Sequence, residues 1–259
     1  MQKDNDQLIS SSLAFCGIIF FLFIILNRIL RSSIGGGIVM LYADGMLRFL
    51  ISIPCIIVLG KIIQDNGFKF SLSTKGFKKG MFAHLFFLLW IFLRLPLFFT
   101  ATEINIEFIP AVPAIIFFDL ANGIFEEVLF RGILMTAILI QFGETVRGRI
   151  FSVVFSGIVF GLIHLYGGNF LTVLFTGLIG MGFAAAYVYS KNLLSCIIVH
   201  ALWNYAMKIP NVLIADVNNA GLWSASQMIM YISLVAILLF AIILTIKAEP
   251  HFNVYKQFQ

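Results

Sequence analysis

Long apolar stretches, separated by short polar turns, take up most of this sequence. A membrane-spanning helix needs about 20 predominantly apolar residues, and eight stretches reach or approach that length. They cover residues 13–30, 38–63, 81–100, 109–140, 150–166, 170–190, 193–209 and 224–246. Charged residues make up only 11% of the chain, whereas a soluble domain has roughly 25%. The sequence therefore predicts an all-α, polytopic transmembrane helical bundle of about eight spans, with no room for a separate soluble domain.

Lysine and arginine are distributed unevenly between the predicted loops. If the N-terminus lies inside the cell, eleven of the seventeen basic residues lie in inner loops or at the inner ends of spans, and three lie in outer loops or at the outer ends of spans. Because basic loops favour the cytoplasmic side, we expect a multi-pass protein of the cell membrane with both termini cytoplasmic. The net charge of +5 is then explained by topology and by contact with anionic lipid, and no nucleic-acid partner is expected.

The stretch at 109–140 is too long for one upright span at about 1.5 Å per residue. It contains Pro110 and Pro113 near its start, and a proline inside a helix removes a backbone hydrogen bond. We therefore expect either a strongly tilted helix or a broken, interfacial first part that ends near residues 119–123.

Ionisable residues are rare inside the predicted spans, and one group of them lies in the fourth, in the segment FEEVLFRG. A charged residue at the centre of a membrane helix costs about 2.5 to 3.5 kcal/mol and usually faces the interior of the bundle. Glu127 and Arg131 are four residues apart, so they can form an ion pair along the helix. Glu126 points about 100° away from Glu127. It is left to interact with a different neighbour, and it is a candidate general base.

Two further spans carry polar residues at the same four-residue spacing. The fifth span contains FGLIH, with Phe160 and His164, and the seventh contains HALWN, with His200 and Asn204. Histidine can take up or release a proton near neutral pH, and the asparagine amide can donate a hydrogen bond to a developing oxyanion. A glutamate, two histidines and an asparagine together are what hydrolysis of a peptide bond by an activated water requires.

Each of these features, taken alone, has a structural explanation. A single histidine in a span is more often a packing residue than a catalyst, and a single Glu–Arg pair is often structural. Their joint occurrence, in order and on separate spans, is harder to explain by packing. EEVLFR at 126–131, FGLIH at 160–164 and HALWN at 200–204 resemble the three motifs of the CPBP family (CAAX protease and bacteriocin-processing, also called Abi-type). The members are intramembrane endopeptidases, and the resemblance covers roughly residues 110–210.

The resemblance implies a hydrolase that cleaves a peptide bond with a glutamate-activated water. By position, Glu126 and His164 would activate the water, and His200 and Asn204 would hold the oxyanion. The substrate would be a peptide or a membrane protein that meets the enzyme in the lipid bilayer. A short peptide, a bacteriocin-like precursor and a C-terminal tail are the expected forms.

The same resemblance gives Glu127 and Arg131 a supporting role, in which they keep the first motif in shape. It also predicts the domain organisation. We expect an N-terminal three-span region at 1–108, a catalytic core at 109–210, and a C-terminal span and tail at 211–259.

Alternatives to a metal-free protease stay open at this point. Two histidines and a glutamate can bind zinc and leave a fourth position open, so a zinc-dependent protease is one alternative. The sequence has no HExxH motif, and the ligands would have to converge from three helices, so no cofactor is our first expectation. A second alternative is a non-catalytic membrane protein that binds a peptide or confers bacteriocin immunity. A proton-coupled transporter is disfavoured because the sequence shows no internal repeat.

Two features outside the motifs also make predictions. Asp44 and Arg48 in the second span are four residues apart and are expected to neutralise each other. Gly157 and Gly161 form a GxxxG pattern on the fifth span, and small residues at this spacing let membrane helices approach closely. Such an approach would help polar faces on separate helices to converge.

Overall fold

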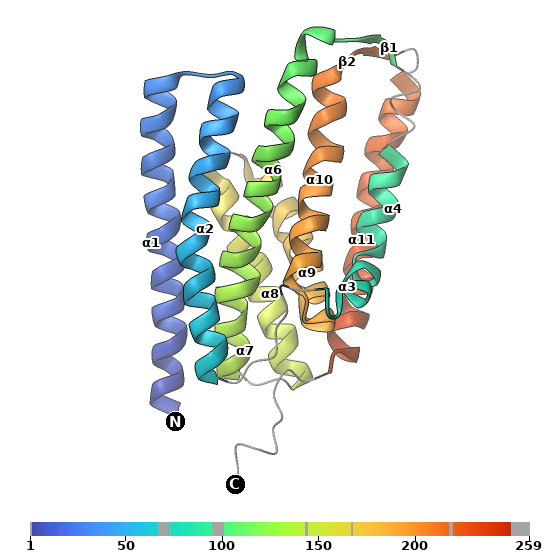
Figure 1. Cartoon of the computed structure of the whole chain (residues 1–259). Helices are drawn as coiled ribbons and strands as arrows, with labels where there is room; N and C mark the ends of the chain where they lie inside the picture. Colours follow the sequence, from blue (N-terminus) through green and yellow to red (C-terminus); the bar gives the residue numbers. More distant parts are fainter. Residues whose placement is uncertain are drawn as a thin grey trace.

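A computed structural model describes residues 2–66, 72, 74–94, 101–142, 145–166, 168–217 and 220–249 of the chain. Within them, seven helices are long and apolar enough to cross a membrane, and Figure 1 shows them packed as one bundle. They are α1 (Gln2–Ile34), α2 (Ile38–Asn66), a continuous run over Ile106–Phe142, α8 (Val146–Ile163), α9 (Phe170–Ser190), α10 (Leu193–Leu213) and α11 (Ala220–Lys247). The prediction of an all-α polytopic bundle is confirmed.

The third predicted span, 81–100, is not a single long helix in the described part of the chain. It is divided between α3 (Phe77–Ala83) and α4 (Leu85–Arg94), and residues 95–100 lie outside the described residues. The two helices meet at His84, where the backbone leaves the helical region (φ −98°, ψ 17°). An α-helix rises about 1.5 Å per residue, so the ten residues of α4 are too short to cross a bilayer alone. Within the described residues, seven long helices and this pair of short ones stand where we predicted about eight spans, and the number of spans stays a prediction.

The long fourth stretch forms one unbroken helical run. A 3-10 turn (Ile106–Ala111) leads into α6 (Val112–Glu127), which is followed by a π-helical segment (Val128–Met135) and α7 (Thr136–Phe142). Of the two alternatives that we expected, the break near residues 119–123 is therefore wrong, and the tilted helix stays a prediction. Figure 1 shows α6 and α7 crossing the bundle along one line.

The positions of the two prolines explain why this helix is not interrupted. Pro110 lies in the 3-10 turn, and Pro113 lies in the first turn of α6. The first backbone N–H groups of a helix have no hydrogen-bond partner within that helix, so a proline in the first turn removes no helical hydrogen bond. The irregularity comes later, in the π-helical segment that begins directly after the two adjacent glutamates. Such segments are rare and often occur at functional sites.

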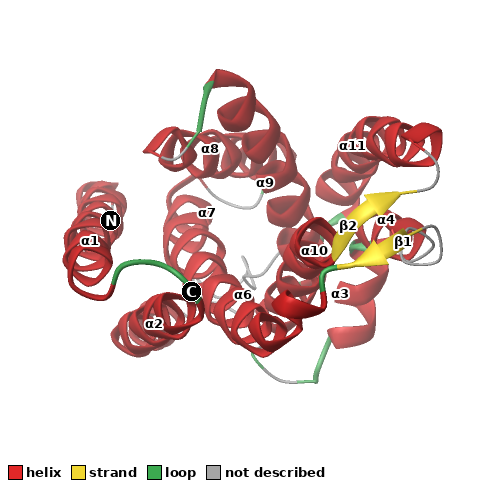
Figure 2. Cartoon of the chain, turned by 90° about the horizontal axis from the view of Figure 1, so that it is seen from above, coloured by secondary structure: helices red, strands yellow, loops and turns green. Residues whose placement is uncertain are grey.

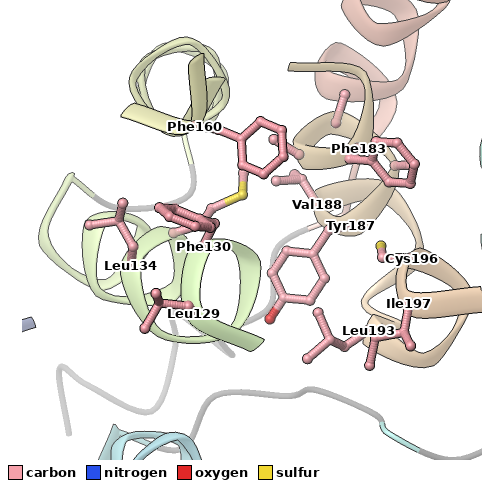
Figure 3. Packing of buried hydrophobic residues seen from close by; sticks show 14 of the residues in the cluster. Leu129, Phe130, Leu134, Phe160, Phe183, Tyr187, Val188, Leu193, Cys196 and Ile197 are labelled. Carbon is pink, nitrogen blue, oxygen red and sulfur yellow. The ribbon is translucent and has the colours of Figure 1, made fainter. Parts of the chain in front are cut away.

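The core of the bundle lies between the long helical run, α8, α9 and α10. Figure 2 shows these helices in the middle, with α1 and α2 on one flank and α4 and α11 on the other. In Figure 3, Phe130 of the π-helical segment lies next to Phe160 of α8, and Tyr187 and Phe183 of α9 lie between them and α10. The rings of Phe130 and Phe160 meet edge to face with their centroids 5.4 Å apart. Large apolar side chains thus determine where the three motif-bearing helices meet.

Helices α8 and α9 approach each other closely at glycines. A Cβ atom on Gly161 would lie 2.5 Å from the carbonyl oxygen of Val173, and one on Gly157 would lie 2.8 Å from that of Gly177. These distances leave no room for a side chain, so the close approach predicted from the GxxxG pattern is confirmed. The contact holds the end of α8, where His164 lies, against the first half of α9.

A short antiparallel ribbon, which the sequence did not predict, lies at one end of the bundle. Its strands are β1 (Ala101–Ile104) and β2 (Ile214–Val217), and Figure 1 shows it above α10. The start of α1 and the end of α11 lie at the opposite end in the same view. This arrangement agrees with the prediction that the start of α1 and the end of α11 lie on the same side of the membrane. That this side is the cytoplasm stays a prediction.

Candidate active site

A cavity of about 710 Å³ lies among α1, α2, α6, α8, α9 and α10. The polar residues that line it are Asn27, Arg28, Arg31, Arg48, Asn122, Glu126, His164, Thr172, His200, Asn204 and Lys208. Glu126 comes from α6, His164 from the end of α8, and His200 and Asn204 from α10. The structure therefore brings to one cavity the four side chains that the sequence predicts to act together.

The two adjacent glutamates at the end of α6 have different surroundings. Glu127 is fully buried. Its Oε1 lies 3.1 Å from Nη1 of Arg131 and 2.7 Å from Nδ1 of His200. Glu126 is 8% exposed and lines the cavity, with its Oε2 3.6 Å from Nε2 of His200. The Glu127–Arg131 ion pair predicted from the four-residue spacing is confirmed, and Glu126 is directed towards the cavity.

Arg131 anchors the π-helical segment to α9. Its Nη2 donates to the carbonyl oxygen of Gly180 at 3.1 Å, and its guanidinium lies 4.3 Å from the ring centroid of Phe160 and 5.6 Å from that of Phe183. The side chain is fully buried. Burial of an ion pair removes hydration from both charges, and this cost is offset only when each charge has further polar partners. Here those partners come from α9 and α10, so the pair ties three helices together.

His200 connects the two glutamates. Its Nδ1 lies 2.7 Å from Oε1 of Glu127, and its Nε2 faces Oε2 of Glu126 at 3.6 Å. An ionised carboxylate only accepts hydrogen bonds, so Nδ1 is the donor and Nε2 is the ring nitrogen available to the cavity. The imidazole also packs against Phe183, with the ring centroids 5.3 Å apart. Contact with Glu127 thus fixes both the orientation and the tautomer of His200.

His164 and Asn204 complete the group of predicted residues at the cavity. His164 caps α8, and its Nδ1 lies 2.8 Å from the backbone oxygen of Phe160. In the neutral ring Nδ1 therefore donates, and Nε2 is left as an acceptor. Asn204 lies one turn after His200 on α10 and is half-buried. The ring of Phe160 contacts both imidazoles, with centroids 4.8 Å from His164 and 6.2 Å from His200.

The sequence did not show that the second span also contributes to this cavity. The predicted pairing of Asp44 with Arg48 is confirmed, because Nε of Arg48 donates to Oδ1 of Asp44 at 2.9 Å. In addition, Nη1 of Arg48 donates to Oδ1 of Asn122 and lies 3.9 Å from Oε1 of Glu126. One signal was available in the sequence. An arginine has five N–H donors, more than one aspartate four residues away can accept. The sequence does not say which helix supplies the other acceptors.

The arrangement of donor atoms can be compared with what zinc needs. Within the residues that the structure describes, no group of three or more histidine, cysteine, aspartate or glutamate side chains is placed to hold a metal ion. The Nδ1 atoms of His164 and His200 are both hydrogen-bonded within the protein. Of the remaining donors, Nε2 of His200 and Oε2 of Glu126 face each other at 3.6 Å. A three-ligand zinc site is therefore not assembled among the described residues, and the zinc-dependent alternative stays a prediction.

Comparison with protein families gives a match over the helices that build most of the cavity. Residues 108–206 match the family described as Type II CAAX prenyl endopeptidase Rce1-like. These residues form a CAAX protease (CPBP) family domain. The resemblance seen in the three motifs is thereby confirmed. Searches of the curated proteins and of the solved structures found no significant match.

The CAAX protease domain runs from the 3-10 turn before α6 through most of α10. It contains all six residues that the sequence predicts for the site. Membership of this family supports intramembrane peptidase activity, and the seven apolar helices make the chain a multi-pass membrane protein. Helices α1 and α2 lie outside the matched region, although both contribute to the wall of the cavity.

Proposed function

We propose that this protein is an intramembrane endopeptidase. In this proposal Glu126 and His164 activate a water that attacks the peptide bond, and His200 and Asn204 hold the oxyanion. The observation that supports it is that these four side chains, from three helices, line one cavity. The CAAX protease domain over the same helices supports the class of reaction.

The first step is attack of the water on the carbonyl carbon of the scissile bond. Glu126 takes a proton from the water as the new C–O bond forms, so the attacking oxygen becomes nucleophilic without free hydroxide. His164 helps to orient the water by accepting its second hydrogen at Nε2, because Nδ1 is occupied by the carbonyl oxygen of Phe160. The products of this step are a tetrahedral intermediate and a protonated Glu126.

Negative charge then develops on the former carbonyl oxygen. The side-chain amide of Asn204 donates an N–H to it. In this proposal His200 enters the reaction with a proton on each ring nitrogen, donates from Nε2, and keeps both protons throughout the cycle. The carboxylate of Glu127 balances the positive charge of that imidazole through Nδ1. The C–N bond breaks when the oxyanion reforms the carbonyl group, and Glu126 gives its proton to the leaving nitrogen.

Glu127 and Arg131 transfer no proton in this mechanism. Glu127 accepts the hydrogen bond from Nδ1 that orients His200, as the carboxylate behind a catalytic histidine does in other hydrolases. Arg131 holds Glu127 in place through the ion pair of 3.1 Å. Their proposed role is therefore to orient the imidazole that faces the cavity.

The substrate is proposed to be a peptide segment that reaches the membrane, such as a short peptide, a bacteriocin-like precursor or a C-terminal tail. The matched family is described as a CAAX prenyl endopeptidase, so a lipidated C-terminal tail belongs among the peptides to be assayed. A peptidomic comparison of cells that express the wild type or Glu126→Ala identifies peptides whose cleavage depends on this carboxylate.

Glu126→Ala tests the proposal directly. A general base usually contributes about 10²- to 10⁴-fold to the rate, so cleavage by the purified variant in lipid vesicles is expected to fall by that factor. Its thermal unfolding should stay close to that of the wild type, because the side chain lies at the edge of a cavity. Glu107→Ala is the matched control, since this glutamate is exposed in the 3-10 turn, and it should cleave at the wild-type rate.

Two results would contradict the proposal. Cleavage that continues undiminished in folded Glu126→Ala would reject the assigned chemistry. Peptide binding or immunity that is retained in Glu126→Ala, in a protein whose wild type cleaves none of the peptides, would favour the non-catalytic alternative.

A further inference from the structure

Arg48 makes contacts on two helices. It belongs to α2, outside the region that matches the CAAX protease family. Its side chain is 13% exposed and lines the cavity. Nε donates to Oδ1 of Asp44 on its own helix at 2.9 Å, while Nη1 donates to Oδ1 of Asn122 and lies 3.9 Å from Oε1 of Glu126 on α6. The guanidinium also lies 4.3 Å from the ring centroid of Phe23 on α1.

The ion pair with Asp44 involves only the Nε edge of the Arg48 guanidinium. An arginine within a span costs about 2.5 to 3.5 kcal/mol, and an ion pair four residues away on the same helix offsets part of that cost. The other edge is turned towards α6, where Asn122 and Glu126 are four residues apart and therefore lie on one face. A bond to Asn122 fixes the guanidinium beside the carboxylate that the proposed mechanism uses as a base.

The charges around Glu126 give this contact a role in the reaction. The groups that face its carboxylate are Arg48 from α2 and the imidazole of His200 from α10, while Glu127 is the next residue on its own helix. Among these groups Arg48 is the one that carries a permanent positive charge. A cation attracts a carboxylate at this distance, so Arg48 favours the orientation of the Glu126 side chain that points into the cavity.

We propose that Arg48 is a positioning residue that keeps the carboxylate of Glu126 directed towards the water. This inference rests on the proposed function, in which Glu126 is the general base. The N-terminal helices are then more than a lipid-facing addition to the CAAX protease domain, because α2 completes its site. Loss of Arg48 lowers turnover (kcat) and leaves the binding of substrate largely intact.

The test uses the full-length protein in lipid vesicles. The probe is a fluorogenic peptide, chosen from a library because the wild type cleaves it and Glu126→Ala does not. We expect Arg48→Ala to lower kcat by about 10- to 100-fold, because misplacement of a reacting group by about 1 Å can cost about 100-fold, and to change KM by less than about threefold. Millimolar guanidinium should restore part of the lost kcat in a saturable way, because the side chain that it replaces borders the cavity. Urea at the same concentration should restore none.

A matched control, Arg31, tests whether the position of the positive charge beside Glu126 matters, or only the presence of a positive charge near Asp44. Arg31 also pairs with Asp44, at 3.7 Å, but its side chain is 64% exposed. Arg31→Ala is expected to lower kcat by a smaller factor than Arg48→Ala, with no rescue by guanidinium. Equal losses in the two variants, or a kcat within twofold of wild type in Arg48→Ala, would overturn the inference. A loss that guanidinium does not restore would assign Arg48 a purely structural role and would overturn it as well.

Removal of Arg48 leaves Asp44 buried at 2% exposure with a weaker partner, and this variant can therefore fail to fold. In that case the double variant Asp44→Asn, Arg48→Gln removes both charges and is compared with Asp44→Asn alone. A lower kcat in the double variant supports the inference, and equal values of kcat contradict it.

The same experiments distinguish failure of this inference from failure of the proposed function. If the wild type shows no cleavage that depends on Glu126, both fall; if it does and Arg48→Ala is fully active, only this inference falls.

Discussion

The N-terminal helices and the CAAX protease domain differ in how much of their surface the protein covers. In the most apolar 18 residues of each helix, 17% are buried in α1 and 22% in α2, against 56% in α9 and 50% in α10. Lipid tails are as apolar as leucine, so burial of apolar surface gives little drive for helices to associate within a membrane. Close packing and polar contacts must hold the domain together, and α1 and α2 mainly face lipid.

The contacts between the two regions are concentrated in the part of the domain that carries the first motif. Sγ of Cys16 lies 3.6 Å from the backbone oxygen of Leu129, and the rings of Phe23 and Phe125 have centroids 5.2 Å apart. Arg48 adds the polar contact to α6. The comparison therefore predicts that substitutions inside the domain destabilise the fold, whereas most substitutions on the N-terminal helices do not.

The largest effect on stability is expected for Arg131→Met. The side chain is fully buried and paired with Glu127, and its removal leaves a buried carboxylate with only His200 as its partner. Removal of one member of a buried pair costs about 3 to 5 kcal/mol. The free energy of unfolding in detergent micelles, measured against the wild type, checks this value.

A double variant shows whether the loss comes from the uncompensated charge. Glu127→Gln, Arg131→Met removes both charges, and replacement of a whole pair is often close to neutral. The double variant should therefore be more stable than Arg131→Met. If Arg131→Met costs less than about 1 kcal/mol, the ion pair does not hold the domain and the contrast between the two regions is weakened.

The pairs within one helix could be predicted from the sequence because four-residue spacing fixes which side chains share a face. Glu127 with Arg131 and Asp44 with Arg48 both follow from this rule, and both are present. The separation of Glu126 from its neighbour follows from it too. The spacing therefore gives the local geometry of each motif without reference to any other helix.

Contacts between helices could not be predicted in this way. The cost of a charge within a span indicates that Arg48 faces the bundle interior, but it does not show that the neighbour on that side is α6. The π-helical segment Val128–Met135 has no marker in composition, because one altered hydrogen-bond register needs no particular residue type. The division of the third span at His84 was hidden for a related reason, since the residues on both sides of it are apolar.

A smaller effect is expected for Gly161→Ala on α8. The added Cβ would lie 2.5 Å from the backbone oxygen of Val173, and a backbone atom cannot turn aside as a side chain can. Overpacking of this kind typically costs about 1 to 3 kcal/mol. We expect a loss of unfolding free energy in that range, together with reduced cleavage, because the contact positions the end of α8 that carries His164.

Gly17→Ala on α1 is the matched control for that substitution. A Cβ atom on Gly17 would meet nothing within 4 Å, and alanine is a better helix former than glycine by about 0.8 to 1.0 kcal/mol. The control should be neutral or stabilising. Destabilisation by Gly17→Ala as large as that by Gly161→Ala would mean that α1 is packed as tightly as α8, contrary to the comparison.

The smallest effect is expected for Ile18→Ala on the outer face of α1. This side chain is 66% exposed and would contact lipid both in the folded bundle and in the separated helices. Its truncation to alanine therefore removes the same lipid contact from both states, and the free energy difference between them hardly changes. The free energy of unfolding should change by less than about 0.5 kcal/mol. Phe23→Ala on the same helix should cost more, because Phe23 is 7% exposed and packs on Phe125. A cost of more than about 1 kcal/mol for Ile18→Ala would show that this face of α1 has a protein partner, and would place α1 with the tightly packed helices of the domain.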